Sequence, residues 1–88
     1  MVYVIIVYDI GVERQNRVRE FLKRYLIHVQ NSVFEGEIKE SDLFYISEYL
    51  KVLIDEEKDS VIIYVFPTQS SISKKIVIGR EEPAPFIV

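Results

Sequence analysis

Cysteine is absent from this chain of 88 residues, and histidine occurs once. The lack of cysteine excludes disulfides and thiolate metal sites, and it is typical of a reducing compartment. The single histidine excludes any site that needs two histidine ligands from one chain. Glycine and proline number three each, whereas 49% of the residues are hydrophobic. The composition therefore predicts a folded globular chain and not a disordered one.

Long hydrophobic runs are also missing. The apolar run at the amino terminus stops at Asp9 and has no basic leader. It is too short for a membrane span or a signal peptide, so we expect a cytoplasmic location and no membrane association. The chain is long enough for one domain, and a domain of this size would gain stability from dimerisation.

The net charge of −3 argues against a general nucleic-acid-binding protein. The charge is unevenly distributed, however. Residues 12–28 carry five basic and two acidic side chains, whereas residues 39–59 carry three basic and seven acidic ones. The first segment predicts a basic stripe, which is either a nucleic-acid contact or a solvated helix face. Its basic residues are Arg14, Arg17, Arg19, Lys23 and Arg24.

Hydrophobic periodicity predicts a strand and then a helix in the first third of the chain. Residues 2–8 are continuously apolar, which is typical of a central strand covered on both faces. After Asp9-Ile10-Gly11, apolar residues recur at helical spacing and predict an amphipathic helix from about Val12 to Ile27. The basic stripe would occupy the polar face of that helix.

The remaining elements follow from shorter patterns. Val29 to Ile38 is typical of two short strands joined near Asn31-Ser32, or of one bent strand. Ser41 is a suitable N-cap for a second helix, and acidic residues 55–57 would fray its last turn. Residues 61–66 and 76–79 are predicted strands, and residues 83–88 form an apolar tail punctuated by proline.

The predicted order is β-α-β-β-α-β with one extra strand. This order predicts an α+β, ferredoxin-like domain, with an antiparallel sheet and both helices on one face. We expect the domain to cover residues 1–80 and the extended tail to cover residues 81–88. The order by itself does not indicate a function, because this fold hosts many unrelated activities.

Asp9 is the first candidate functional residue. It follows a buried strand, so its carboxylate would be held on a rigid element, which suits a hard cation such as Mg²⁺. The alternative is that Asp9 caps the following helix or satisfies a turn. One carboxylate is a poor metal site, but a symmetric dimer could bring two copies together.

The segment Gln30-Asn31-Ser32-Val33-Phe34-Glu35-Gly36 is the second candidate. Polar residues that alternate with Phe34 on a strand could present its ring for base stacking and Ser32 for a phosphate contact. The alternative is a hairpin with Phe34 in the core. The pattern alone leaves both interpretations open.

Several motifs together resemble the CRISPR-associated Cas-two family, the smaller of the two adaptation proteins. The resemblance runs from Met1 to about Arg80. The combination of Tyr-Asp with Gln-x-Ser-Val-Phe is its most specific part. The motifs are Val7-Tyr8-Asp9-Ile10, Asn16-Arg17-Val18, the segment 30–36, Asp59-Ser60-Val61-Ile62-Ile63-Tyr64 and Ile76-Val77-Ile78-Gly79.

The resemblance implies a ferredoxin-like homodimer in which the last strand, Ile76 to Gly79, pairs with the sheet of the other subunit. It implies that the two Asp9 carboxylates face each other across the dimer axis and hold Mg²⁺. It also implies metal-dependent endonuclease activity on single-stranded RNA or double-stranded DNA. Finally, it implies a partnership with the Cas-one integrase in the insertion of new CRISPR spacers.

Carried over by residue, the resemblance makes Asp9 the catalytic metal ligand and Arg17 a contact to the phosphate backbone. Ser32 and Phe34 match the Ser-Val-Phe motif. Arg14, Arg19 and His28 complete the candidate nucleic-acid contacts. Gln15 and His28 stand where some members have arginine, which puts hydrolysis in doubt more than binding.

Two other functions compete with a nuclease. A non-catalytic scaffold would bind a duplex through its basic helices and dock the integrase through the last strand and the tail. A toxin ribonuclease of the VapD type would share the fold. The nuclease would depend on Asp9, whereas the scaffold would depend on Arg14 and Arg17.

Overall fold

The computed structural model describes residues 1–67 and 74–80, and its elements follow the order β-α-β-β-α-β-β. Residues 68–73 and the predicted tail lie outside the described residues. The five strands and two helices are β1 (Val2–Asp9), α1 (Val12–Leu22), β2 (Ile27–Gln30), β3 (Val33–Ile38), α2 (Glu40–Leu53), β4 (Ser60–Pro67) and β5 (Lys74–Gly79).

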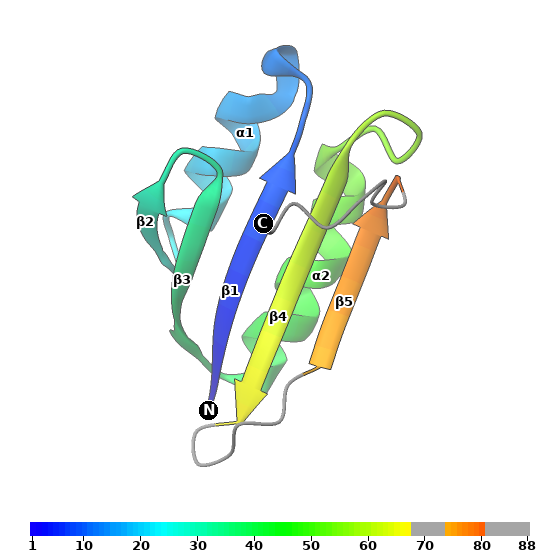
Figure 1. Cartoon of the computed structure of the whole chain (residues 1–88). Coiled ribbons are helices and arrows are strands. Elements are labelled where there is room, and N and C mark those ends of the chain that lie inside the picture. Colours follow the sequence, from blue (N-terminus) through cyan, green and yellow to red (C-terminus); the bar gives the residue numbers. More distant parts are fainter. Residues whose placement is uncertain (68–73, 81–88) are drawn as a thin grey trace, which may run out of the picture.

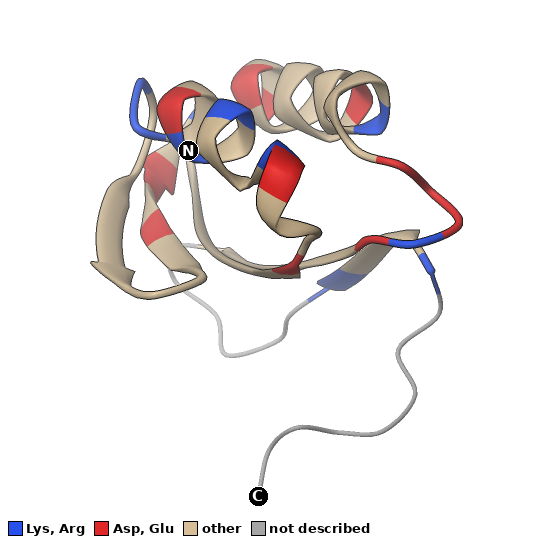
Figure 2. Cartoon of the chain, turned by 90° about the horizontal axis from the view of Figure 1, so that it is seen from above, with Lys and Arg blue, Asp and Glu red and all other residues tan. Residues whose placement is uncertain are grey.

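The strands form one sheet in the order β2-β3-β1-β4-β5, and every neighbouring pair is antiparallel. Both helices lie on the same side of this sheet, so the molecule has two layers (Figures 1 and 2). This arrangement confirms the predicted α+β, ferredoxin-like fold with an additional strand. Neither described helix has the length and apolar character that a membrane span requires.

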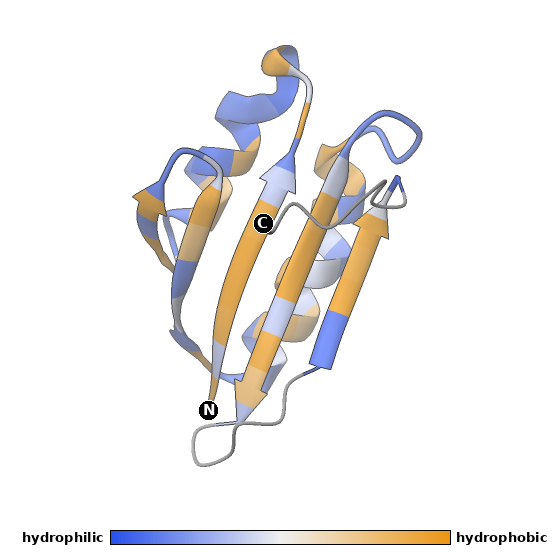
Figure 3. Cartoon of the chain, viewed as in Figure 1, coloured by the Kyte–Doolittle hydropathy of each residue, from blue (hydrophilic) through white to orange (hydrophobic). Residues whose placement is uncertain are grey.

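The core lies between the helices and the sheet. Alternate residues of β1, from Val2 to Tyr8, point into it and are buried. Val18 and Leu22 of α1 and Ile46 and Leu50 of α2 cover them, as the predicted helical periodicity requires. The hydropathy colouring shows the long apolar stretches of β1 and β4 at the centre of the sheet (Figure 3).

The ends of both helices differ from the prediction. Helix α1 ends at Leu22 and not at Ile27, because Ile27 pairs with Glu35 as the first residue of β2. Helix α2 begins at Glu40, so the prediction of Ser41 as its N-cap is wrong. Lys39 holds that position and makes no side-chain capping hydrogen bond.

The acidic residues 55–57 lie beyond α2, which ends at Leu53. The chain turns there, and the Asp59 N–H donates to the Asp55 carbonyl at 2.7 Å. Ending the helix early moves these carboxylates away from its negative carboxyl end, where they would be unfavourable. The predicted fraying is therefore replaced by an ordered turn that leads into β4.

Strand β5 pairs with β4 of its own chain, with Ile76 opposite Ile63 and Gly79 opposite Ser60. The expected pairing of this strand with a second copy is not tested by a single chain and stays a prediction. Within the described residues, the outer edge of β5 has no neighbouring strand. An edge strand is the part of a sheet to which a strand of another chain can be added.

Candidate active site

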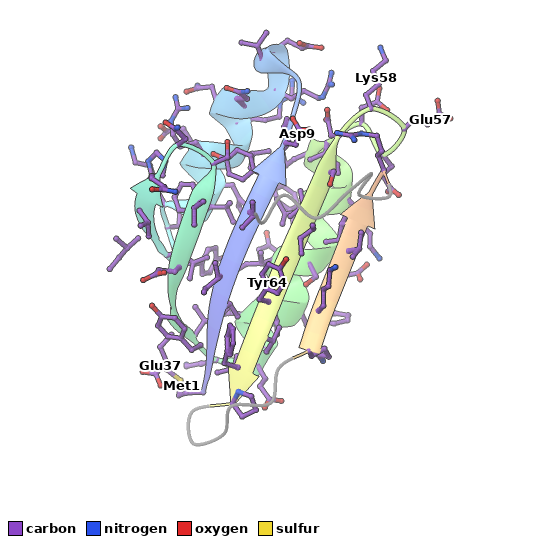
Figure 4. The ribbon with its side chains drawn as sticks, viewed as in Figure 1. Met1, Asp9, Glu37, Glu57, Lys58 and Tyr64 are labelled. Atoms are coloured by element: carbon purple, nitrogen blue, oxygen red, sulfur yellow. The ribbon has the colours of Figure 1, made fainter. Side chains whose placement is uncertain are left out.

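Asp9 lies at the end of β1, opposite Ser60 of β4. Its side chain is 82% exposed, and its Oδ2 accepts a hydrogen bond from Arg80 Nη2 at 2.9 Å. Figure 4 shows Asp9 at the end of the sheet that also holds the loop with Glu57 and Lys58. The carboxylate thus lies at the end of a strand, as the sequence predicts, and the structure adds that it is accessible.

The face of the sheet that carries Asp9 is not covered by any described helix or strand (Figure 2). Side chains alternate along a strand, so Asp9 shares this face with Tyr3, Ile5 and Val7. We call it the open face. Its other apolar members are Val33, Ile62, Tyr64, Phe66 and Val77, which follow from the registers with β3, β4 and β5.

The open face explains one departure from the sequence prediction. The continuous apolar run of β1 predicts cover on both faces, but Tyr3, Ile5 and Val7 are only half-buried in one chain. Tyr64 lies in front of β4, on this uncovered side (Figure 4). A largely apolar sheet face that ends in a carboxylate is typical of an interface.

Asp59 anchors the loops next to Asp9. It is fully buried, and Arg14 binds it bidentately, with Nη2 2.8 Å from Oδ1 and Nε in contact with Oδ2. The N–H groups of Gly11 and Asp55 donate to the same carboxylate, each at 2.9 Å. The pKa of Asp59 lies well below its ordinary value, chiefly because Arg14 donates hydrogen bonds to the carboxylate. The same contacts raise the pKa of Arg14.

These contacts change the role of Arg14. The sequence predicts that its guanidinium contacts nucleic acid, but in the structure Arg14 is only 15% exposed and is bound by Asp59 and Glu13. Releasing it to a phosphate would leave the Asp59 carboxylate buried without its counter-ion, which is costly. The geometry therefore assigns Arg14 to holding α1 against the loop before β4.

Phe34 is fully buried, so the structure favours the core interpretation over base stacking. Its ring stacks on His28 at 4.5 Å and on Tyr8 at 6.2 Å between centroids. The Tyr8 N–H also donates to the Ser32 carbonyl at 3.1 Å. The Ser-Val-Phe motif therefore holds the end of β1 in place, one residue before Asp9.

The other predicted contacts are near the surface. His28 is exposed, and its Nε2 lies 2.7 Å from the Asn31 carbonyl oxygen. Arg19 donates to Asn16 Oδ1 at 2.6 Å. Arg17 is exposed, and within residues 1–67 and 74–80 its side chain has no hydrogen bond or ion pair. Among Arg14, Arg17 and Arg19, Arg17 is thus the one whose guanidinium is not bound by another described side chain and is available for a phosphate.

Arg80 was not singled out by the sequence. An arginine that follows a glycine at the end of a strand has no distinguishing pattern, and its contact with Asp9 spans 71 positions. Asp59 was noted only as part of a motif. Both residues acquire their place at the site through contacts between segments that are far apart in the sequence.

The donor set around Asp9 is an oxygen donor set, which suits a hard cation such as Mg²⁺. No group of three His, Cys, Asp or Glu side chains suited to a metal occurs in the described part of the chain. Mg²⁺ is commonly held by only one or two carboxylates, with water and phosphate oxygens completing its coordination. An exposed Asp9 on a rigid strand meets that requirement, and a second copy would supply the second carboxylate.

Comparison with known proteins agrees with this fold and these motifs. A sequence model described as CRISPR associated protein Cas2 matches residues 1–73. The CRISPR-associated endoribonuclease Cas2 of Nanoarchaeum equitans is 52% identical over 80 residues, which are 91% of this chain and 87% of that relative. The relative with the same name in Methanothermobacter thermautotrophicus is 46% identical over 87 residues, 99% of this chain and 96% of its own.

The likeness extends to three dimensions. A crystal structure of cas2 superposes with a TM-score of 0.73 at 43% sequence identity, covering 99% of this chain and 97% of that one. The family match and both relatives span most of the chain, including Asp9, Arg17 and the Ser-Val-Phe motif. The chain therefore belongs to the CRISPR-associated Cas2 family.

Proposed function

We propose that this chain is a Mg²⁺-dependent endoribonuclease of CRISPR antiviral defence that cleaves single-stranded RNA in the cytoplasm as a homodimer. The observation that carries the proposal is the position of Asp9, an exposed carboxylate on a rigid strand at the edge of the open face. Its relatives are named endoribonucleases, which supports the same activity here. Double-stranded DNA is the alternative substrate.

The dimer would form when two open faces pack together. Burying half-exposed side chains such as Ile5 and Val7 would contribute roughly 25 cal/mol for each Å² of apolar surface removed from water. Because Asp9 belongs to the same face, this packing would bring the two carboxylates to a common axis. The continuous apolar pattern of β1 supports a second layer of this kind.

At such a site Asp9 would bind the cation, and Arg17 would bind the phosphate backbone. Bound Mg²⁺ would supply a polarised phosphoryl oxygen and a more acidic water. If His28 acted as the general base it would do so through Nδ1, since its Nε2 donates to the Asn31 carbonyl and its ring stacks on Phe34. The roles proposed for the described residues are therefore binding of the cation by Asp9 and binding of the phosphate by Arg17.

The test is cleavage of single-stranded RNA and duplex DNA across a Mg²⁺ titration. Asp9→Asn should lower RNA cleavage by about 100-fold, the scale on which removal of one charge-stabilising group acts, and EDTA should abolish it. Glu56→Gln, at an exposed position in the turn after α2, is the control and should cleave like the wild type. Equal cleavage by Asp9→Asn and the wild type would contradict the proposal.

A second candidate function is a nucleic-acid-binding scaffold for the Cas-one integrase during spacer acquisition. It is favoured by Arg17 and Arg24, which are exposed and whose guanidinium groups make no hydrogen bond or ion pair within the described chain. The outer edge of β5, beside which no other described strand lies, would allow the integrase to add a strand. The family match supports either Cas2 function over a toxin ribonuclease of the VapD type.

The two functions predict opposite results in an acquisition assay. The scaffold requires duplex binding that weakens steeply with salt and is lost when Arg17 and Arg24 are both changed to Glu. Asp9→Asn should then leave spacer acquisition intact. The opposite pattern, with loss in Asp9→Asn and retention in the charge-reversal variant, would overturn the scaffold.

A further inference from the structure

Arg80 is held at the end of β5 by contacts from three directions. Its N–H donates to the Asp59 carbonyl at 2.7 Å, its Nε to the Lys58 carbonyl at 3.1 Å, and its Nη2 to Asp9 Oδ2 at 2.9 Å. Two of these acceptors are backbone carbonyls of the loop before β4. The guanidinium is therefore tethered independently of its contact with Asp9.

Gly79 makes this position possible. Its φ of 90° lies in the left-handed region, which favours glycine. A Cβ added there would also collide with the backbone carbonyl of Asp59. The chain thus turns tightly over the Asp59 loop, and this turn delivers Arg80 to the site where β1 ends.

The contact between Arg80 and Asp9 is open to exchange. The side chains are 33% and 82% exposed, and an ion pair at such exposure contributes little to stability. Arginine carries five N–H donors, and within the described residues the guanidinium of Arg80 donates only through Nε and Nη2. The guanidinium can therefore give up Asp9 and bind another anion without losing its anchor on the Lys58 carbonyl.

We propose that Arg80 is a phosphate-binding residue of the Asp9 site and that it competes with the divalent cation for the Asp9 carboxylate. Before a cation binds, Arg80 neutralises Asp9. When a cation takes Asp9, the displaced Nη groups stay beside it and bind a non-bridging phosphate oxygen of the nucleic acid. This inference rests on the proposed Mg²⁺ site at Asp9.

Removing the Arg80 charge should change the affinities for the cation and for nucleic acid in opposite directions. Removing the Arg80 charge takes away a competitor of the cation, so the affinity of Asp9 for the cation should rise. The same change removes a donor to phosphate, so the affinity for nucleic acid should fall. A residue that served only the fold would weaken both together or neither.

The experiment measures Mn²⁺ binding by electron paramagnetic resonance and binding of a labelled 2′-O-methyl oligonucleotide in the presence of Mn²⁺. Arg80→Gln should bind Mn²⁺ about threefold more tightly than the wild type, the scale of an exposed ion pair, and should bind the oligonucleotide about tenfold more weakly. Arg80→Lys keeps the charge but cannot keep the Nε contact. It should bind Mn²⁺ like the wild type and the oligonucleotide with intermediate affinity.

Two control variants separate the causes. Arg17→Gln removes an arginine that has no contact with Asp9 in the structure, and should weaken oligonucleotide binding with no change in Mn²⁺ affinity. Asp9→Asn should lose Mn²⁺ binding. Thermal unfolding shows whether each variant is folded. If Arg80→Gln is unstable, Arg80→Lys, which should remain folded, is compared with the wild type in its place.

The outcomes distinguish this inference from the proposed function. If the wild type binds Mn²⁺ through Asp9 while Arg80→Gln binds it equally or less tightly, Arg80 does not compete at the site and the inference is wrong. If oligonucleotide affinity is unchanged in Arg80→Gln, its phosphate role is wrong. If Asp9→Asn and the wild type bind Mn²⁺ alike, the metal site fails and the inference fails with it.

Discussion

Arg14 of α1 and Asp59, the residue before β4, form a bidentate ion pair although 45 positions separate them. The carboxylate is fully buried and also accepts hydrogen bonds from the N–H groups of Gly11 and Asp55. Its own carbonyl accepts from the Arg80 N–H. The side chain and backbone of Asp59 therefore connect the ends of β1, α1, α2 and β5 at the end of the sheet where Asp9 lies.

Breaking this pair should destabilise the fold strongly. Asp59→Asn removes the buried counter-ion of the largely buried Arg14 and leaves it only the exposed Glu13, and we expect a loss of about 3 kcal/mol in the free energy of unfolding. Urea unfolding at a fixed protein concentration measures the change. Glu13→Gln is the matched control, since Glu13 pairs with the same arginine but is 63% exposed, and should cost less than about 1 kcal/mol. Similar losses in both variants would contradict a special role for Asp59.

The same pair predicts a stability that falls in acid. The folded-state pKa of Asp59 is lowered, chiefly by the hydrogen bonds from Arg14, so the unfolded chain binds a proton at higher pH than the folded chain does. The stabilisation is complete above the ordinary aspartate pKa of about 3.9. It is lost as the pH falls below that value toward the folded-state pKa.

Urea unfolding of the wild type and Asp59→Asn between pH 3 and pH 7 tests this dependence. The free energy of unfolding of the wild type should be nearly flat from pH 7 to pH 5 and then decline. The decline should be shallower in Asp59→Asn, because the variant lacks the group that takes up the proton. Parallel curves would show that other carboxylates account for the acid sensitivity.

Phe34 should behave as a core residue and not as a base-stacking one. Phe34→Leu keeps an apolar side chain but loses the ring stacked between His28 and Tyr8, and we expect a cost of about 1–2 kcal/mol in unfolding free energy. RNA affinity of the folded variant should stay within about twofold of the wild type, because the ring is fully buried. A tenfold loss of RNA affinity with unchanged stability would restore the stacking role.

The elements of the fold could be predicted because their signals are local. The apolar run of β1 and the start of α1 near Val12 follow from short-range patterns, and two strands joined near Asn31-Ser32 are one of the two alternatives that such patterns offer. The early end of α1 could not, because Ile27 has helical periodicity until pairing with Glu35 places it in β2. Helix ends are decided by such tertiary contacts as much as by propensity.

The candidate site likewise has features that local sequence patterns predict and features that depend on tertiary contacts. Asp9 could be found because a carboxylate at the end of a buried strand is visible in the sequence. Two contacts could not be predicted: the ion pair of Arg14 with Asp59 and the ion pair of Arg80 with Asp9. Each depends on loops that meet only in the folded chain. The open face did have a signal in the sequence, because the apolar run of β1 has no polar alternation. This pattern indicates a second layer on that face.

The open face should be the dimer interface, and a matched pair of lysine substitutions tests it. Ile5→Lys introduces a charge at the centre of this face, directly opposite Glu35, so the single chain can tolerate it. Val52→Lys introduces the same charge on α2, at a position that is 70% exposed and lies on the other layer. The first variant should prevent two open faces from packing, whereas the second should have no effect.

Sedimentation velocity measures the result. The wild type and Val52→Lys should sediment with twice the chain mass of 10.4 kDa, and Ile5→Lys should sediment as a single chain. Ile5→Lys should also lose RNA cleavage, because separating the copies leaves each Asp9 without the second carboxylate. If Ile5→Lys stays dimeric and active while Val52→Lys dissociates, the copies meet through the helical layer, and the two Asp9 residues cannot share a cation.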